Sequence, residues 1–168
     1  PLVCHNVAFE AKWFDMQSSW SIPWHRAHDT MIMGQILDPL GSGALKKLTQ
    51  QYIDPQAANL QRVLDDGLID NGWTWGSVPL DFEPYWAYGA LDPVLTMRLW
   101  EKFWPKFCPG ADYSQAYELE MNTRRIVTRM ELNSARVDLD YSQKKHDELV
   151  GYTEDVRSWA KSTYNGLA

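Results

Sequence analysis

An apolar segment at the start of the chain passes directly into a helical one. Residues 2–5 (LVCH) are short, apolar and without a helical period, which is typical of the end of a buried strand. Asn6 is a favoured helix N-cap, and residues 7–17 have the composition of a helix. A strand that leads straight into a helix predicts an α/β fold. Because a natural start normally carries Met and a few polar residues, we expect the chain to be cut ahead of Pro1.

Downstream of this strand the sequence predicts mainly helices. Residues 18–27 are expected to form a loop or a short irregular strand. Pro84 is expected in the first turn of a long helix, where its missing N–H costs nothing, and Pro93 is expected to bend that helix. Residues 135–137 (ARV) resemble a short strand. The expected helices run from His28-Asp29-Thr30 to Pro39, and over 44–53, 56–68, 81–107, 113–132 and 141–165.

Composition limits the classes of function. Hydrophobic residues make up 45% and charged residues 23% of the chain, the balance of a soluble globular protein. A net charge of −6 argues against a protein that coats nucleic acid, but a site for divalent cations must itself be acidic. Cys4 and Cys108 have no metal-binding spacing, so we expect no zinc site and a reducing compartment. Without a long apolar run or a signal peptide, we expect a cytoplasmic protein with no membrane contact.

The first pattern that indicates chemistry is His5-Asn6-Val7-Ala8-Phe9-Glu10, where the strand end passes into the helix. Side chains of a helix tilt towards its N-terminus, so Glu10 in the first turn leans back to the strand end. Ligands of α/β proteins usually bind at that end of the strands. The alternative is structural, with Asn6 as a cap and Glu10 as a complement to the helix dipole.

The second pattern is the YxxxD sequence Tyr88-Gly89-Ala90-Leu91-Asp92. Residues four apart on a helix face the same way, so the Tyr88 phenol and the Asp92 carboxylate can share one small volume. The alternative places Tyr88 in the core and leaves Asp92 as an ordinary residue before Pro93.

Together, and in this order, the two patterns resemble the second and third exonuclease motifs of DEDD nucleases of the DNA polymerase A proofreading type. The segments HDTMIMGQILDP and ALKKLTQQYI between them are similar to the family's intervening helices. The resemblance implies an incomplete RNase H-like fold over residues 1–110, mostly helical in the part present. It also implies hydrolysis at the 3′ end of single-stranded or primer-template DNA.

The sequence after this region resembles the helices that lead into the thumb of family A polymerases, the phage-encoded ones in particular. Glu131, Asn133, Val137 and Asp138 fit the spacing of that segment, whereas Ser134 stands where the family normally has Gly. The resemblance implies that residues 111–168 begin a polymerase domain, in the cytoplasm of a bacterium or a phage-infected host.

The resemblance also implies a mechanism with two Mg²⁺ or Mn²⁺ ions at the scissile phosphate. Asp92 would bind the metal that activates water, and Glu10, which replaces the usual Asp, would hold the second metal directly or through water. Tyr88 would orient the attacking water. Asn6 would fix the turn that carries Glu10 or contact the substrate backbone.

Other polar and aromatic residues have expected places too. Trp73 and Trp75 are flanked by glycines and are candidates for stacking on unpaired bases, whereas Trp86 is expected in the core. Asp29 is expected to cap a helix instead of binding metal. We assign no metal to His5 or His28.

One family motif is missing. The first exonuclease motif, DxE, supplies two of the four metal-binding acids, and we expect it upstream of Pro1 or on another chain. The sequence Asp81-Phe82-Glu83 opens the YxxxD helix with Asp81 as the expected N-cap, and Asp138-Leu139-Asp140 belongs to the polymerase-like segment. We therefore expect this chain to bind Mg²⁺ poorly and to be inactive by itself.

Three alternatives stay open at this point. The chain resembles a degenerate exonuclease-like module beside a polymerase, although such a module has no chemical reason to keep Asn6, Glu10, Tyr88 and Asp92. An RNA-processing 3′–5′ exonuclease carries the same motifs. The third alternative is an acidic, mainly helical binding domain in which the motifs occur by chance.

Overall fold

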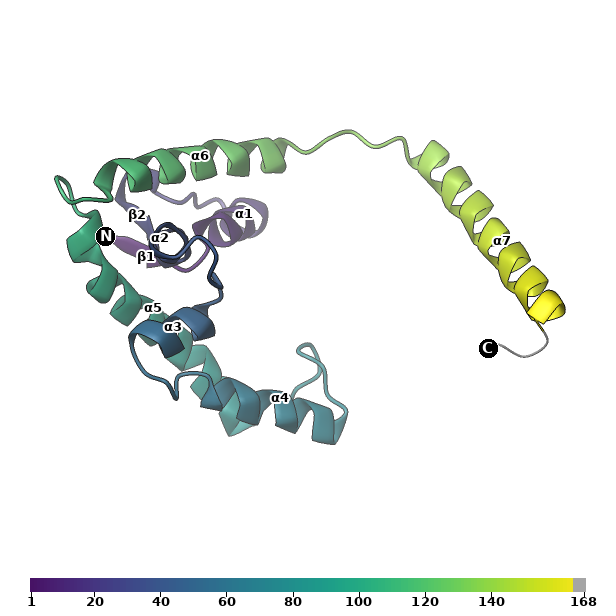
Figure 1. Ribbon diagram of the computed structural model, residues 1–168, viewed down its shortest axis with the longest axis horizontal. Helices are drawn as coiled ribbons and strands as arrows, with labels where there is room; N and C mark the ends of the chain where they lie inside the picture. The colour runs from purple at the N-terminus through teal and green to yellow at the C-terminus, as the bar shows by residue number, and fades with distance from the viewer. Residues whose placement is uncertain (165–168) are drawn as a thin grey trace. The chain divides into compact units, whose positions relative to one another are not determined.

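The computed structural model describes residues 1–164 and divides the chain into two compact units, Pro1–Leu132 and Asn133–Ala168 (Figure 1). The first unit contains a small sheet and most of the helices, and the second contains one long helix. Within the described residues, no helix combines the length and the apolar character needed to cross a membrane. The observed elements agree with the expectation of a mostly helical α/β chain.

The sheet consists of two short parallel strands, β1 (Leu2–Cys4) and β2 (Ala27–Asp29). Their register pairs Leu2 with Ala27 and Cys4 with Asp29. The helix α1 (Val7–Gln17) and the 3₁₀ turn η1 (Trp24–Arg26) form the connection between them. The strand and helix expected at residues 2–17 are confirmed. The sequence assigned residues from His28 onward to a helix, which is wrong, because these residues complete β2 first.

The remaining helices of the first unit pack around α5, the longest of them. Contacts join α5 to β1 and to the three helices before it, while α1 contacts β2. The helices of this unit after the sheet are α2 (Thr30–Leu37), α3 (Leu45–Tyr52), α4 (Asn59–Asn71), α5 (Glu83–Phe107) and α6 (Ser114–Asn133). All five correspond to helices that the sequence predicts, with boundaries shifted by a few residues.

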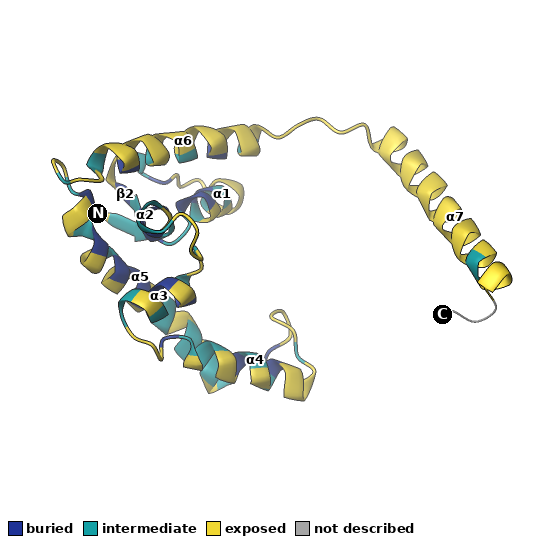
Figure 2. Ribbon diagram, in the orientation of Figure 1, coloured by how far each residue is buried: buried dark blue, intermediate teal, exposed yellow. Residues whose placement is uncertain are grey.

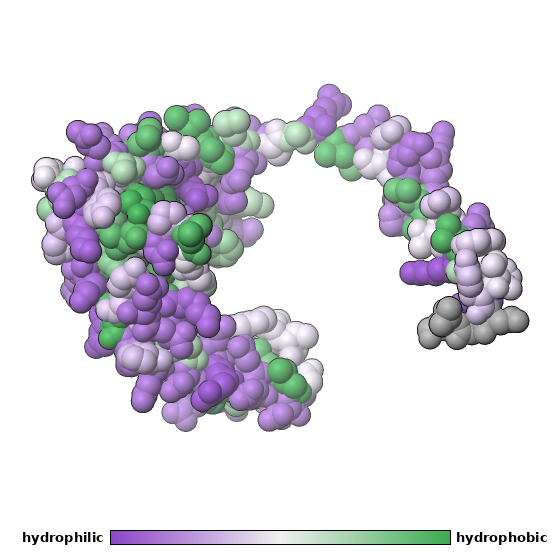
Figure 3. Space-filling view, in the orientation of Figure 1, coloured by the Kyte–Doolittle hydropathy of each residue, from purple (hydrophilic) through white to green (hydrophobic). Residues whose placement is uncertain are grey.

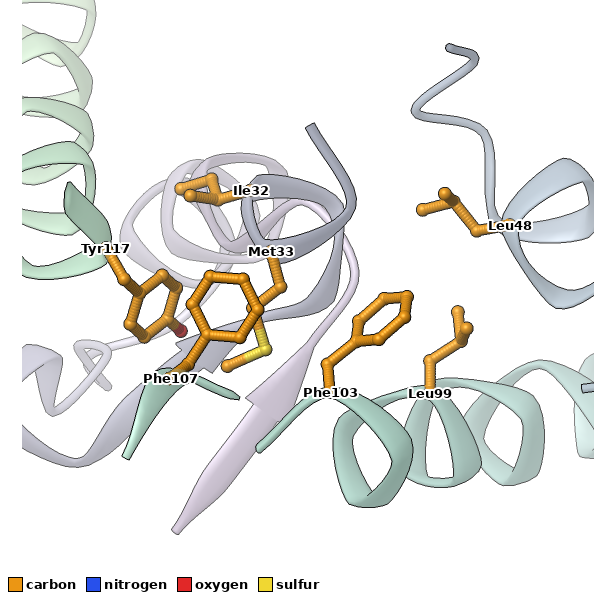
Figure 4. Packing of buried hydrophobic residues seen from close by; sticks show 7 residues of the cluster. All are labelled: Ile32, Met33, Leu48, Leu99, Phe103, Phe107 and Tyr117. Carbon is orange, nitrogen blue, oxygen red and sulfur yellow. The ribbon is translucent and has the colours of Figure 1, made fainter. Parts of the chain in front are cut away.

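The main hydrophobic core lies where α5 meets α2, α3 and α6 (Figure 4). Leu99, Phe103 and Phe107 form one stripe of α5 because their spacing of four residues keeps them on one face. They pack against Met33 of α2 and Leu48 of α3, which are fully buried. Each such side chain contributes roughly 1.5–3 kcal/mol on burial.

A glycine allows α2 and α3 to approach closely. A Cβ added at Gly34 would lie 2.6 Å from Cδ1 and 3.3 Å from Cγ of Leu48. Leu48 is itself enclosed by the core and has little freedom to move away. The position therefore requires a residue without a side chain.

Asp29 connects the sheet to two helices. It is the N-cap of α2, where Oδ1 accepts a hydrogen bond from the N–H of Met31 at 2.9 Å. The same carboxylate accepts hydrogen bonds from the N–H of Asn6 at 3.0 Å and of Val7 at 2.8 Å. Three donors at two helix N-termini thus share one buried carboxylate, which explains why an acid with no exposed surface is stable there.

Two expected caps are corrected. Asn6 stands at the N-cap of α1, but its side chain makes no capping hydrogen bond and its backbone has a φ of 73°, a left-handed conformation that Asn tolerates. Asp81 does not cap α5, because Phe82 occupies that position without a side-chain hydrogen bond. Pro84 lies in the first turn of α5 as predicted. The helix continues through Pro93, and the bend at that residue stays a prediction.

The second unit contains α7 (Leu139–Tyr164), which has no buried residue along its length (Figure 2). Apolar side chains such as Leu149, Tyr152 and Trp159 are among its exposed residues. Figure 3 shows hydrophilic residues over much of the visible face, with hydrophobic residues interspersed.

The prediction of a short strand at residues 135–137 is wrong, since these residues form no regular structure. That α7 belongs to a polymerase domain stays a prediction.

Candidate active site

Glu10 and Asp92 line the same cavity. The cavity has a volume of about 450 Å³, and β1 contributes Val3 and Cys4 to its wall. Glu10 comes from the first turn of α1, immediately after the strand, and Asp92 comes from the middle of α5. Because α5 packs on β1, the two carboxylates from distant parts of the sequence face one space.

Asp92 is held by a lysine that the sequence reading did not single out. The ammonium of Lys46 on α3 forms an ion pair with Oδ1 of Asp92. The same ammonium lies over the ring of Tyr88, 4.6 Å from its centroid. The phenol and the carboxylate of the YxxxD sequence are therefore linked through a single cation, as well as by their positions one turn apart on α5.

Tyr88 is half-buried beside Asp92, and this environment changes its acidity. Burial raises the pKa of the Tyr88 phenol, and the charge of Asp92 together with a hydrogen bond to it raises the pKa further. A phenol with a raised pKa keeps its proton at neutral pH. Tyr88 can thus donate a hydrogen bond and position a neighbouring molecule, but it cannot act there as a base.

His5 also lines the cavity and has both ring nitrogens engaged. Nε2 lies 3.0 Å from the carbonyl oxygen of Gly43, and Nδ1 lies 2.9 Å from Oγ1 of Thr30. Burial lowers the pKa of His5, although the charge of Asp29 opposes this effect. A neutral ring donates from Nε2 to the carbonyl oxygen of Gly43, and Nδ1 shares the single hydroxyl proton of Thr30 with the carbonyl oxygen of Cys4, which lies 3.2 Å from Oγ1. His5 therefore anchors the loop before α3 to the end of β1.

Cys4 carries no reactive thiolate. Both cysteines are free, and Cys4 is a buried residue of the cavity wall. Burial, with the charges of Glu10 and Asp29, raises the pKa of the Cys4 thiol to about 12. A thiol that stays protonated at neutral pH is a poor nucleophile and a poor metal ligand.

The three tryptophans considered from the sequence have different environments. Trp75 is 52% exposed, and its ring lies 5.7 Å from that of Tyr88. Trp73 is only half-exposed and packs edge-on against Phe82 at 5.3 Å, in a small cluster between α4 and α5. Trp86 was expected in the core, which is wrong, because it is 60% exposed.

Not every expected site residue reaches the cavity. Glu10 and Asp92 line it, and Tyr88 is connected to it through Lys46 and Asp92. The backbone of Asn6 is bound by Asp29, so Asn6 shapes the turn before Glu10. The expectation that Asp29 caps a helix is confirmed.

The donor chemistry of the cavity fits part of a divalent-cation site. Carboxylate oxygens are the ligands that Mg²⁺ and Mn²⁺ prefer, and Glu10 and Asp92 supply two carboxylates. Within residues 1–164, however, His, Cys, Asp and Glu side chains form no group of three or more that could hold a metal ion. Two carboxylates alone make an incomplete site for such a cation, which takes six or more oxygen ligands.

Lys46 and His5 are the residues that sequence reasoning did not assign to the site. Lys46 is next to Lys47 in the sequence, and the helical spacing from Lys46 to the buried Thr49 is a weak signal that Lys46 faces inward. His5 directly follows β1, and its position at the strand end is its signal.

Comparison with known proteins gave a family match for the first part of the chain. Residues 1–107 match a family model described as 3′–5′ exonuclease, of the DNA polymerase A type. No curated protein and no solved structure matched the chain. The matched residues make up more than half of the 168 residues and include both Glu10 and the YxxxD sequence. The chain therefore belongs to the family of 3′–5′ exonuclease domains of the DNA polymerase A type.

Proposed function

We propose that this chain is part of a family A DNA polymerase and contains the C-terminal part of its proofreading exonuclease. Its substrate is the single-stranded 3′ end of DNA, from which nucleotides are removed by two-metal phosphodiester hydrolysis on an RNase H-like fold. The observation that carries the proposal is the shared cavity of Glu10 and Asp92, with Tyr88 one helical turn from Asp92.

The two carboxylates have distinct places in this proposal. Asp92 and Glu10 are the residues of this chain that would hold Mg²⁺ or Mn²⁺, since both line the cavity. Divalent cations bound there would clamp the scissile phosphate and make water a better nucleophile. The remaining acids would come from a DxE motif outside the residues of this chain, and without them we expect no activity.

Tyr88 is the positioning residue of the reaction. Its raised pKa keeps the phenol protonated, so its hydroxyl orients the attacking water through a hydrogen bond and leaves proton removal to other groups. Its ring is held in place by the Lys46 ammonium on one side and by contact with Trp75. An oriented hydroxyl contributes through geometry, which depends on this packing.

Trp75 is the residue that we propose for stacking on an unpaired base. It combines an exposed ring with a place beside Tyr88, and base–aromatic stacking is tolerant of sequence. Trp73 supports the same loop through Phe82 and contributes to binding indirectly. Asn6 maintains the turn that aims Glu10 at the cavity.

The test is a 3′-end degradation assay with 5′-labelled single-stranded DNA and Mg²⁺. We compare the chain alone with the protein expressed together with its upstream codons, each with Asp92→Asn and with Asp81→Asn as the matched control. Asp81 is exposed and stands in the unrelated DxE sequence that opens α5. The expected result is activity of the longer protein that Asp92→Asn abolishes and Asp81→Asn leaves unchanged.

Other outcomes identify the alternatives. Degradation by the isolated chain that depends on Asp92 would contradict the incomplete site. A longer protein without nuclease activity would identify a degenerate module beside a polymerase. Faster degradation of a matched RNA than of DNA would identify an RNA-processing exonuclease.

A further inference from the structure

Lys46 is a buried cation in an otherwise acidic cavity region. Its side chain is 9% exposed, whereas the neighbouring Lys47 is exposed on the same helix. A buried ammonium is costly unless a negative charge and further polar contacts compensate for lost hydration. Lys46 has two such partners, the Asp92 carboxylate and the face of the Tyr88 ring. Its place is thus determined by the YxxxD sequence of α5.

The ion pair occupies an oxygen that the proposed function needs. Lys46 engages Oδ1 of Asp92, and Asp92 lines the cavity together with Glu10. A divalent cation at Asp92 would lie within a few ångströms of the ammonium, and like charges at such a distance in a partly buried site repel strongly. Binding of the cation and retention of the ion pair therefore oppose each other.

We propose that Lys46 is the resident counter-cation of Asp92, which neutralises this carboxylate in the metal-free protein and competes with a divalent cation for it. The inference rests on the proposed function, because it takes Asp92 as a metal ligand. Its consequence is that Lys46 stabilises the empty site and weakens the affinity of an incomplete site for metal. Lys46 is therefore a positioning residue that acts through Asp92. A divalent cation displaces it from Asp92 more readily when further acids complete the metal site.

The primary experiment measures Mn²⁺ affinity from the electron paramagnetic resonance signal of free Mn²⁺. Lys46→Met removes the ammonium, and Lys47→Met removes an equal charge from an exposed position of the same helix. We expect Lys46→Met to lower the dissociation constant for Mn²⁺ about tenfold relative to Lys47→Met. An unchanged or raised dissociation constant in Lys46→Met would overturn the proposal.

A second variant separates this inference from the proposed function. In the double variant Lys46→Met, Asp92→Asn, we expect the gain in Mn²⁺ affinity to disappear. If Mn²⁺ affinity persists without the Asp92 carboxylate, the metal role of Asp92 fails, and both proposals fail with it. If Asp92 is required but Lys46→Met binds no more tightly than Lys47→Met, the competition proposal alone fails.

A measurement on the unmodified chain covers the case in which Lys46→Met does not fold. Mg²⁺ titration followed by NMR should shift the Nζ resonance of Lys46 together with the carboxyl carbon of Asp92, while the Lys47 resonance stays in place. A shift of the Asp92 carboxyl carbon with no change at Lys46 would show that metal binds without disturbing the ion pair, and would overturn the proposal.

Discussion

The hydroxyl of Tyr117 accepts a 2.9 Å hydrogen bond from the backbone N–H of Asp29. Tyr117 lies in the first turn of α6, after the residues that match the exonuclease family, and Asp29 ends β2. Both residues are buried, and Tyr117 belongs to the main core cluster. The start of α6 therefore completes the packing of the exonuclease region, whatever domain the later residues belong to.

Removal of the Tyr117 hydroxyl should destabilise the first unit. Tyr117→Phe keeps the ring in the core but leaves the buried N–H of Asp29 without its acceptor, at a cost of about 1–3 kcal/mol. Urea unfolding measures this difference. Tyr113→Phe, at a partly exposed position of the same segment, is the control. Equal stabilities for the two variants would show that the hydrogen bond contributes little.

Asp29 should be one of the most sensitive positions of the fold. Asp29→Ala deprives three backbone N–H groups at two helix N-termini of their acceptor, and we expect a loss of at least about 3 kcal/mol. Thermal unfolding by circular dichroism checks the loss of helix together with the loss of stability. Asp15→Ala, on the exposed face of α1, should change stability by no more than about 0.5 kcal/mol. A similar effect of both substitutions would contradict the shared-cap interpretation.

Two glycine substitutions should have opposite effects. Gly34→Ala places a methyl group against Leu48 in a closed core and should cost about 1–3 kcal/mol. Gly89→Ala adds a methyl group in open space within α5 and should stabilise the helix by about 0.5–1 kcal/mol. Free energies of unfolding from denaturant titration compare the two. A neutral Gly34→Ala would show that α2 and α3 can separate without penalty.

Stability should fall when the pH drops below about 6.5. Burial lowers the pKa of His5 and of His28, so the unfolded chain takes up protons at a higher pH than the folded chain. This contribution to stability is present above the unfolded-state pKa and is lost as the pH falls through the lower folded-state values. His5→Gln and His28→Gln should each flatten the decline between pH 7 and 5, measured as the midpoint of urea unfolding.

Local sequence patterns predicted the helices well, because the signals that start and end a helix lie within a few residues of each other in the sequence. The start of α1, the proline in the first turn of α5 and the capping role of Asp29 follow from such patterns. The sequence predicted a loop or a short irregular strand over residues 18–27 and did not locate β2 at Ala27–Asp29, since three residues are too few to show alternation and the strand depends on pairing with β1. The capping of α1 by Asp29 was likewise invisible, because the donor and the acceptor are far apart in the sequence.

The candidate site shows the same division. The family's motif positions led to Glu10, Tyr88 and Asp92 as candidate site residues. In the structure, the two acids Glu10 and Asp92 line the same cavity. The sequence could not show that Lys46, and not Lys47, pairs with an acid of the site. The helical repeat indicates which face of a helix is apolar, but not which charged residue contacts a partner on another helix. The burial of tryptophans also depends on tertiary contacts, which is why Trp86 was wrongly placed in the core.

Glu10 and Asp92 are proposed to act as parts of one catalytic site. The direct measurement is a double-mutant cycle on the rate of Mg²⁺-dependent 3′-end degradation, in the protein that includes the upstream residues. Glu10→Gln and Asp92→Asn should each lower the rate by at least about a hundredfold, and the double variant should be little slower than the single ones. Glu83→Gln, an exposed acid at the start of α5, should leave the rate unchanged. Independent, additive losses, or full activity of either single variant, would contradict the account.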